Sequence, residues 1–237
     1  MNPLLDFIEV ERAKYVLPDG NLFAISLSQS SRYYDFISIV FERYKLASNQ
    51  SVSKFSELQQ ALSTYGYGAY SDEQMKKASE HHQIATLVHL EIESFYLFAK
   101  IFLDKIAFFL RDYFGEAKGV SLISHHELQK NLERLRLAKD LIYPDGFSGS
   151  IIFLQEHLVD FRDDEIVHKT NPRTIKGTVY DGEQVSIMRE RIYPNERDKH
   201  VESSPLSELM LVIDKYVEQI LIIIKTNREK SRFHLLE

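Results

Sequence analysis

Two side chains that could together handle a phosphate and a proton stand six positions apart at the end of an apolar helical segment. They are Arg162 and His168, in the stretch FRDDEIVH at residues 161–168. The Arg guanidinium is a permanent cation whose forked N–H donors match phosphate oxygens, and His titrates near neutral pH without help from its surroundings. This pair of residue types predicts phosphate binding combined with proton transfer.

The spacing of Arg, a polar residue, four further residues and His resembles the signature of the HEPN family of helical bundles, with Asp163 as the polar residue. The resemblance extends over roughly residues 71–230. It implies a homodimer in which the Arg and His residues of two protomers meet in one cleft about a two-fold axis. Many members are metal-independent endoribonucleases of defence or toxin–antitoxin systems, and others are non-catalytic.

The resemblance also implies a role for each residue. An RNA 2′-hydroxyl would attack the neighbouring phosphate, with His168 as acid or base and Arg162 as the clamp on the developing charge. Asp163 would orient Arg162 or the partner's His. The implied function is a metal-independent endoribonuclease acting as a homodimer, with RNA as substrate and an antitoxin or regulatory protein as a further partner. The alternative is a non-catalytic helical dimer that serves as a protein- or nucleic-acid-binding module.

Helix geometry explains why a second protomer would be needed. Six residues of a regular helix correspond to about 600°, so Arg162 and His168 would point about 120° apart. One protomer alone therefore makes a poor site. A second match to the Arg–His spacing, Arg228 and His234, lies at the C-terminal end and lacks the preferred residue after Arg, so we interpret it as a chance match.

The charges that surround the motif have opposing effects. Asp164 and Glu165 share a helix face with His168, so they should stabilise its protonated form and repel an RNA backbone. A local basic strip predicted to bind the substrate follows at once: Lys169, Arg173 and Lys176. In the simplest alternative, these charged residues form an ordinary solvated helix face.

Metal chemistry is less well supported by the sequence. Glu165 and His168 form one E-x-x-H unit, but helical di-metal proteins use this unit twice and the chain has no second copy. The His and Glu residues at positions 81–93 are spread over different helix faces. We therefore predict no metal site and no cofactor. His125 and His126 stand where a helix begins, which suggests a cap or exposed side chains.

The composition is that of a soluble globular protein. The 237 residues are 44% hydrophobic and 27% charged, with a net charge of −6 and no cysteine. The charge excludes a broad basic surface for nucleic acid, and the missing cysteines exclude disulfides and thiolate metal sites. Acidic residues at positions 6, 9 and 11 argue against a secretory signal, and charges interrupt the apolar region 84–114, so we expect a cytoplasmic protein without a membrane span.

The hydrophobic periodicity predicts a mainly α-helical bundle with one or two small β-hairpins. We expect residues 1–70 to form an N-terminal extension and residues 71–237 to form the bundle. In the extension, a hairpin at 13–27 turns at Pro18-Asp19-Gly20 and helices follow at 32–46 and 53–65.

Ser71 and Gln74 predict a capping box that begins the longest helix, 71–114. Some of the many aromatic rings of this helix would contact another protomer. Helices at 124–143, 151–168 and 205–229 complete the bundle, with a second hairpin at 174–193 and a polar linker at 195–204.

Overall fold

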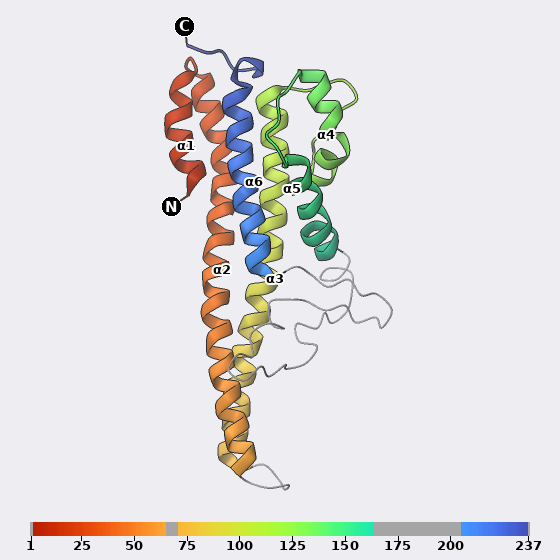
Figure 1. The fold of residues 1–237 in the computed structure, drawn as a ribbon. Helices are drawn as coiled ribbons and strands as arrows, with labels where there is room; N and C mark the ends of the chain where they lie inside the picture. Colours follow the sequence, from red (N-terminus) through yellow and green to blue (C-terminus); the bar gives the residue numbers. More distant parts are fainter. Residues whose placement is uncertain (1, 65–70, 164–204, 237) are drawn as a thin grey trace.

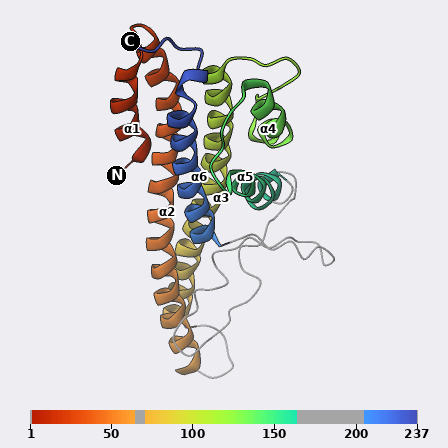
Figure 2. The same cartoon turned by 45° about the horizontal axis from the view of Figure 1, so that its top comes forward.

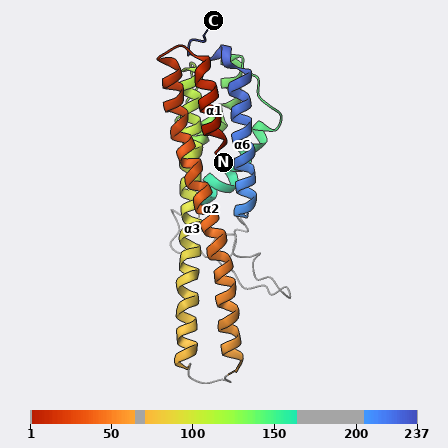
Figure 3. The same cartoon turned by 90° about the vertical axis from the view of Figure 1, so that its left-hand side faces the viewer.

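The computed structural model describes residues 2–64, 71–163 and 205–236, which form an elongated helical bundle (Figure 1). Two long antiparallel helices, α2 (Asp19–Thr64) and α3 (Asp72–Phe114), run its full length. One end of this pair packs against α1 (Pro3–Glu11) and α6 (Leu206–Thr226). Helix α4 (His125–Lys139) lies beside α3, and α5 (Phe147–Leu154) packs on α6 and α4 (Figure 2). The other end of the α2–α3 pair extends beyond these helices (Figure 3).

The predicted long helix is confirmed, and its first turn shows why it begins where it does. The Ser71 hydroxyl accepts a hydrogen bond from the Gln74 backbone N–H at 3.2 Å, and Gln74 Oε1 accepts one from the Ser71 N–H at 2.8 Å. These two bonds form a capping box, which satisfies backbone donors that a helix start leaves free. The helix ends at Gly115, whose φ of 72° suits a residue without a Cβ.

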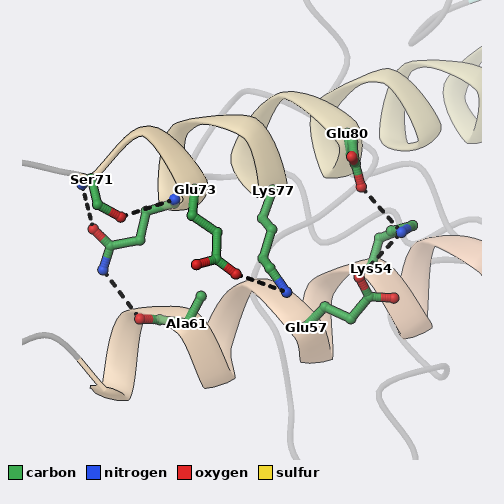
Figure 4. A network of polar contacts seen from close by, with 8 residues as sticks. Lys54, Glu57, Ala61, Ser71, Glu73, Lys77 and Glu80 are labelled. Atoms are coloured by element: carbon green, nitrogen blue, oxygen red, sulfur yellow. Dashed lines mark hydrogen bonds and ion pairs between the residues drawn. The ribbon is translucent and has the colours of Figure 1, made fainter.

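Polar contacts fix the register of α2 against α3 near the tip of the pair (Figure 4). Lys54 of α2 bonds Glu57 in its own helix and Glu80 of α3, both at 3.1 Å. The side-chain amide of Gln74 donates to the Ala61 carbonyl at 3.1 Å, which closes the tip. These contacts hold the two helices together where no other described helix covers them.

The predicted hairpin at 13–27 is wrong, because the chain is already helical from Asp19. A Cβ on Gly20 would lie 2.5 Å from the Arg12 carbonyl oxygen, so Gly20 allows the first turn of α2 to pack closely on the short 3₁₀ helix η1 (Arg12–Lys14). Phe23 and Leu27, which suggested a strand, are one helical turn apart and fully buried. Their apolar side chains form part of the buried face of a helix, not of a sheet.

The two helices predicted at 32–46 and 53–65 are parts of the single helix α2. Ser48 and Ser51 are buried, with 7% and 1% of their surface exposed, so they lie on the packed side of a continuous helix. Small residues allow close helix packing here, and this tertiary contact outweighs their weak helix propensity.

The mainly α-helical prediction is confirmed for the described residues, whose only β-type pairs are isolated bridges, such as the one between Tyr15 and Leu235. The predicted hairpin at 174–193 and linker at 195–204 lie outside the described residues. The division predicted at residue 70 falls between α2 and α3, whose buried side chains belong to one hydrophobic core. In the described part of the chain, no helix has an apolar stretch long enough to cross a membrane.

A buried polar network joins the two ends of the chain. Glu11, only 2% exposed, accepts two hydrogen bonds from Arg228, one from Nε at 2.5 Å and one from Nη2 at 3.0 Å. The Tyr15 hydroxyl contacts Glu11 at 3.3 Å and the Tyr113 hydroxyl at 2.6 Å. Arg228 therefore has a structural partner. His234, the other half of the second Arg–His match, pairs with Asp19 and has 83% of its side chain exposed.

Candidate functional site

Arg162 lies at the end of a helical segment with an unusual geometry. Helix α5 continues directly into the π-helix η2 (Gln155–Asp160), and residues 162–163 are again π-helical. Such widened turns occur preferentially at functional sites. Phe161 is buried against the ring of Tyr96 in α3, with 5.6 Å between the ring centres, and this contact anchors the segment just before Arg162.

The side chains of Arg162 and Asp163 are paired. Arg162 Nη1 donates to Asp163 Oδ1 at 2.5 Å, and the two side chains are 22% and 42% exposed. A charge-assisted bond of this kind is shorter and stronger than a hydrogen bond between neutral groups, so it limits the orientations of the guanidinium group. Within the described ranges, Asp163 is the polar partner of the Arg162 side chain.

A pocket of about 250 Å³ lies beside this pair, between α3, the start of α4 and η2. Most of its lining is polar or charged: Lys100, Asp104, Ser124, His126, Gln155, Val159, Asp160 and Asp163. Asp163 lines the pocket and also bonds to Arg162, so it connects the pocket with the Arg162 side chain.

A chain of hydrogen bonds runs behind the pocket and ties its three elements together. Lys100 donates to Asp104 Oδ2 at 2.5 Å, and Asp104 Oδ1 accepts from the His125 backbone N–H at 3.0 Å. The His125 ring contacts Gln155 Oε1 at 3.1 Å, and Gln155 Nε2 donates to Asp160 Oδ1 at 2.7 Å. These bonds fix η2, and with it the approach to Arg162, relative to α3 and α4.

The chain of bonds also determines the tautomer of His125. A carboxylate only accepts hydrogen bonds, so Gln155 must present its amino group to Asp160 and its carbonyl oxygen to His125. His125 Nδ1 therefore carries the proton, and Nε2 is an acceptor without a partner among the described residues. The cap or exposed role expected for His125 is wrong, because its ring is fully buried. Burial lowers its pKa to about 4.

The protein should lose stability in mild acid because of His125. With a folded-state pKa of about 4 and an ordinary value of 6.5, the unfolded chain binds more protons than the folded one between these values. The free energy of unfolding should then fall by up to about 1.4 kcal/mol per pH unit below pH 6.5. Urea titrations from pH 7 to 4.5 should show a flatter dependence for His125→Gln than for the wild type. An equally steep dependence would contradict this assignment, and the exposed His126→Gln is the matched control.

The pocket is not by itself an anion site. Among the described residues, Lys100 neutralises Asp104 and Arg162 neutralises Asp163, whereas Asp160 has only the Gln155 amide as a side-chain donor. A phosphate would thus have to bind on the Arg162 side and use cations from outside the pocket. Within the described ranges, no group of three His, Asp or Glu side chains is arranged to hold a metal ion.

The structure brings Arg162 and Asp163 together. The other predicted site residues lie outside the described residues: His168, Lys169, Arg173 and Lys176. The pocket residues Lys100, Asp104, Gln155 and Asp160 were not predicted as site residues. They come from segments far apart in the sequence, and no local motif connects them.

Comparison of the chain with protein-family models, curated proteins and solved structures gives no match. A functional proposal therefore rests on the residues around Arg162 and on the sequence pattern at 161–168.

Proposed function

We propose that the protein is a metal-independent endoribonuclease that acts as a homodimer in the cytoplasm, in a defence or toxin–antitoxin setting. Arg162 binds the scissile phosphate, and His168 transfers protons. The observation that carries the proposal is the bond from Arg162 to Asp163 at 2.5 Å, at the end of a π-helical segment that is anchored in the core. A guanidinium group held in this way is preorganised for charge that develops during reaction.

The chemistry requires one group that removes a proton and one that supplies it. A base takes the proton of the RNA 2′-hydroxyl, and O2′ forms a bond to the adjacent phosphorus. The bond from phosphorus to O5′ breaks, and an acid protonates the departing O5′. The products are a 2′,3′-cyclic phosphate and a 5′-hydroxyl. Since each protomer has one His168, two protomers related by a two-fold axis would supply both base and acid.

Substrate binding would depend on cations beyond the pocket. Because the pocket retains the negative charge of Asp160, it does not attract an RNA backbone. The basic strip Lys169, Arg173 and Lys176 provides local cations for phosphate contacts, in a chain whose net charge is −6. Binding should accordingly weaken as salt concentration rises.

The charge of Asp160, which no cation among the described residues pairs with, favours a second candidate, a helical binding module without catalysis. A pocket with free carboxylate oxygens accepts N–H donors, so an antitoxin or regulatory protein could present a basic side chain to it. This candidate predicts tight protein binding and no RNA cleavage by the free protein.

Cleavage of an end-labelled single-stranded RNA and of tRNA in EDTA tests the proposal. We expect fragments that end in 2′,3′-cyclic phosphate. A 2′-deoxy substitution at a mapped cleavage site should remove cleavage there, because O2′ is the nucleophile. Cleavage that requires an added divalent metal, or that continues at the deoxy position, would contradict the proposed chemistry.

A further inference from the structure

Helix α3 carries an apolar stripe on the side opposite its buried face. The stripe consists of Leu90, Leu97, Ile101 and Phe108. Leu90 is 54% and Leu97 43% exposed, while Ile101 and Phe108 are half-buried. Spacings of seven, four and seven residues keep the four side chains in line along the helix and are typical of a seam between two helices.

This stripe is symmetric about the level of Ala99. Leu97 and Ile101 each lie two residues from this level, and Leu90 and Phe108 each lie nine residues from it. A second copy of α3 in antiparallel orientation would therefore place Leu97 opposite Ile101 and Leu90 opposite Phe108. Such a surface is complementary to itself, which a two-fold symmetric interface requires.

The centre of the stripe lies at the same level as the candidate site. Phe161 packs on Tyr96, and Asp163 shares the pocket with Lys100 and Asp104. Arg162 and Asp163 thus lie beside residues 96–104 of α3. In an antiparallel pair related by a two-fold axis perpendicular to the helices, the same flank of each helix points to the same face of the pair, so both Arg162–Asp163 pairs would lie on one face, one on each side of the axis.

The charges at this level fit such an arrangement. The two side chains carry opposite charges and are partly exposed, at 22% and 42%. Close to a two-fold axis, each Arg162 can face the partner's Asp163, and both copies gain the same contact. The symmetry of the apolar stripe and the position of the charged pair are independent observations that indicate one axis.

We infer that α3 is the dimer interface: it pairs antiparallel with α3 of a second copy about the level of Ala99 and brings both Arg162–Asp163 pairs into one site. The assignment of this shared site rests on the proposed function. The first and last residues of the apolar stripe are 18 positions apart, or about 27 Å. A single helix pair of this length buries less than the roughly 800 Å² per partner of a standard interface, so the dimer should dissociate on dilution.

Disulfide cross-linking tests the pairing directly, because the wild-type chain has no cysteine. A mixture of Leu90→Cys and Phe108→Cys protomers should form a mixed disulfide under mild oxidation. Each variant alone should not, because its two thiols would lie about 27 Å apart, whereas a disulfide needs Cα atoms within about 7 Å. Cross-linking of Leu90→Cys with itself would indicate a parallel pair, and no mixed cross-link would indicate another interface; either result overturns the inference.

A charge in the stripe should separate the protomers. Leu97→Glu should raise the dimer dissociation constant at least about 100-fold, because two carboxylates would enter an apolar seam. Sedimentation equilibrium measures this constant, and circular dichroism checks that the variant remains folded. The matched control is Leu137→Glu on α4, where Leu137 is 67% exposed and outside the stripe; its dissociation constant should not change.

The outcomes distinguish the interface from the function. A wild type that is monomeric at about 0.2 mM, which is about 200-fold above a dissociation constant of about 1 μM, overturns the inference. The cleavage assay would then test the proposed function separately. A cross-linked dimer that cuts no RNA keeps the interface and rejects the ribonuclease. If monomeric Leu97→Glu cleaves RNA as fast as the wild type, the shared site is wrong.

Discussion

Replacing Arg162 by Ala should lower kcat/KM for RNA cleavage by about 100- to 1000-fold, the usual loss when one preorganised donor to a developing oxyanion is removed. The effect on folding should be small, because the described contact of this side chain is the partly exposed pair with Asp163. Arg162→Lys should recover only part of the activity, since an ammonium group keeps the charge and loses the fork. Initial rates in EDTA at several RNA concentrations give the comparison.

The chain contains a control for this substitution. Arg136 of α4 pairs with Glu133 in its own helix at 2.5 Å, and its side chain is 41% exposed. It therefore also forms a local ion pair, but it lies outside the pocket and outside the α3 stripe. Arg136→Ala should leave kcat/KM unchanged. If both alanine variants lose activity equally, a general loss of positive charge explains the effect and the site assignment is wrong.

Removing Arg228 should be the most damaging single change to stability. Arg228→Ala leaves the Glu11 carboxylate buried with only the Tyr15 hydroxyl as a described partner. Breaking a buried ion pair from one side costs about 3–5 kcal/mol. Glu11→Gln should cost less, because Arg228 has 29% of its side chain exposed and can turn to solvent. Urea unfolding at pH 7 measures both free energies.

Two further variants separate burial from charge. The double variant Glu11→Gln with Arg228→Met should be more stable than Arg228→Ala alone, because no unpaired charge remains buried. Arg136→Ala, which breaks an exposed pair with Glu133, should show no measurable loss. If Arg228→Ala were no more damaging than Arg136→Ala, the network would not be what holds the chain ends together.

The helices with strong local signals could be predicted from sequence. Ser71 and Gln74 begin α3, Gly115 ends it, and the stripe that includes Leu209, Ile213 and Ile220 defines the buried face of α6. Prediction failed where distant contacts decide the structure. Pro18-Asp19-Gly20 has the composition of a turn, but a close approach to Arg12 and the buried Phe23 place it at a helix start. No local pattern contains that information.

The site was predictable only in part for the same reason. The motif identified Arg162 and Asp163, and the structure places them together. His125, however, looked like an exposed residue at a helix start, whereas Gln155, thirty residues away, and the core of the bundle hold it buried. The expected angle of about 120° between Arg162 and His168 also assumed a regular helix. Residues 162–163 are π-helical, so the 100° step does not apply there.

The measurement that tests the central claim most directly is the rate of RNA cleavage in EDTA by the wild type and by His168→Ala, at equal folding and equal dimer content. A metal-independent site built on Arg162 and His168 predicts cleavage by the wild type that His168→Ala reduces at least about 100-fold, the scale of a lost general acid–base group. A wild type that cleaves no RNA at high concentration, or a His168→Ala variant that cleaves it equally well, would contradict the account.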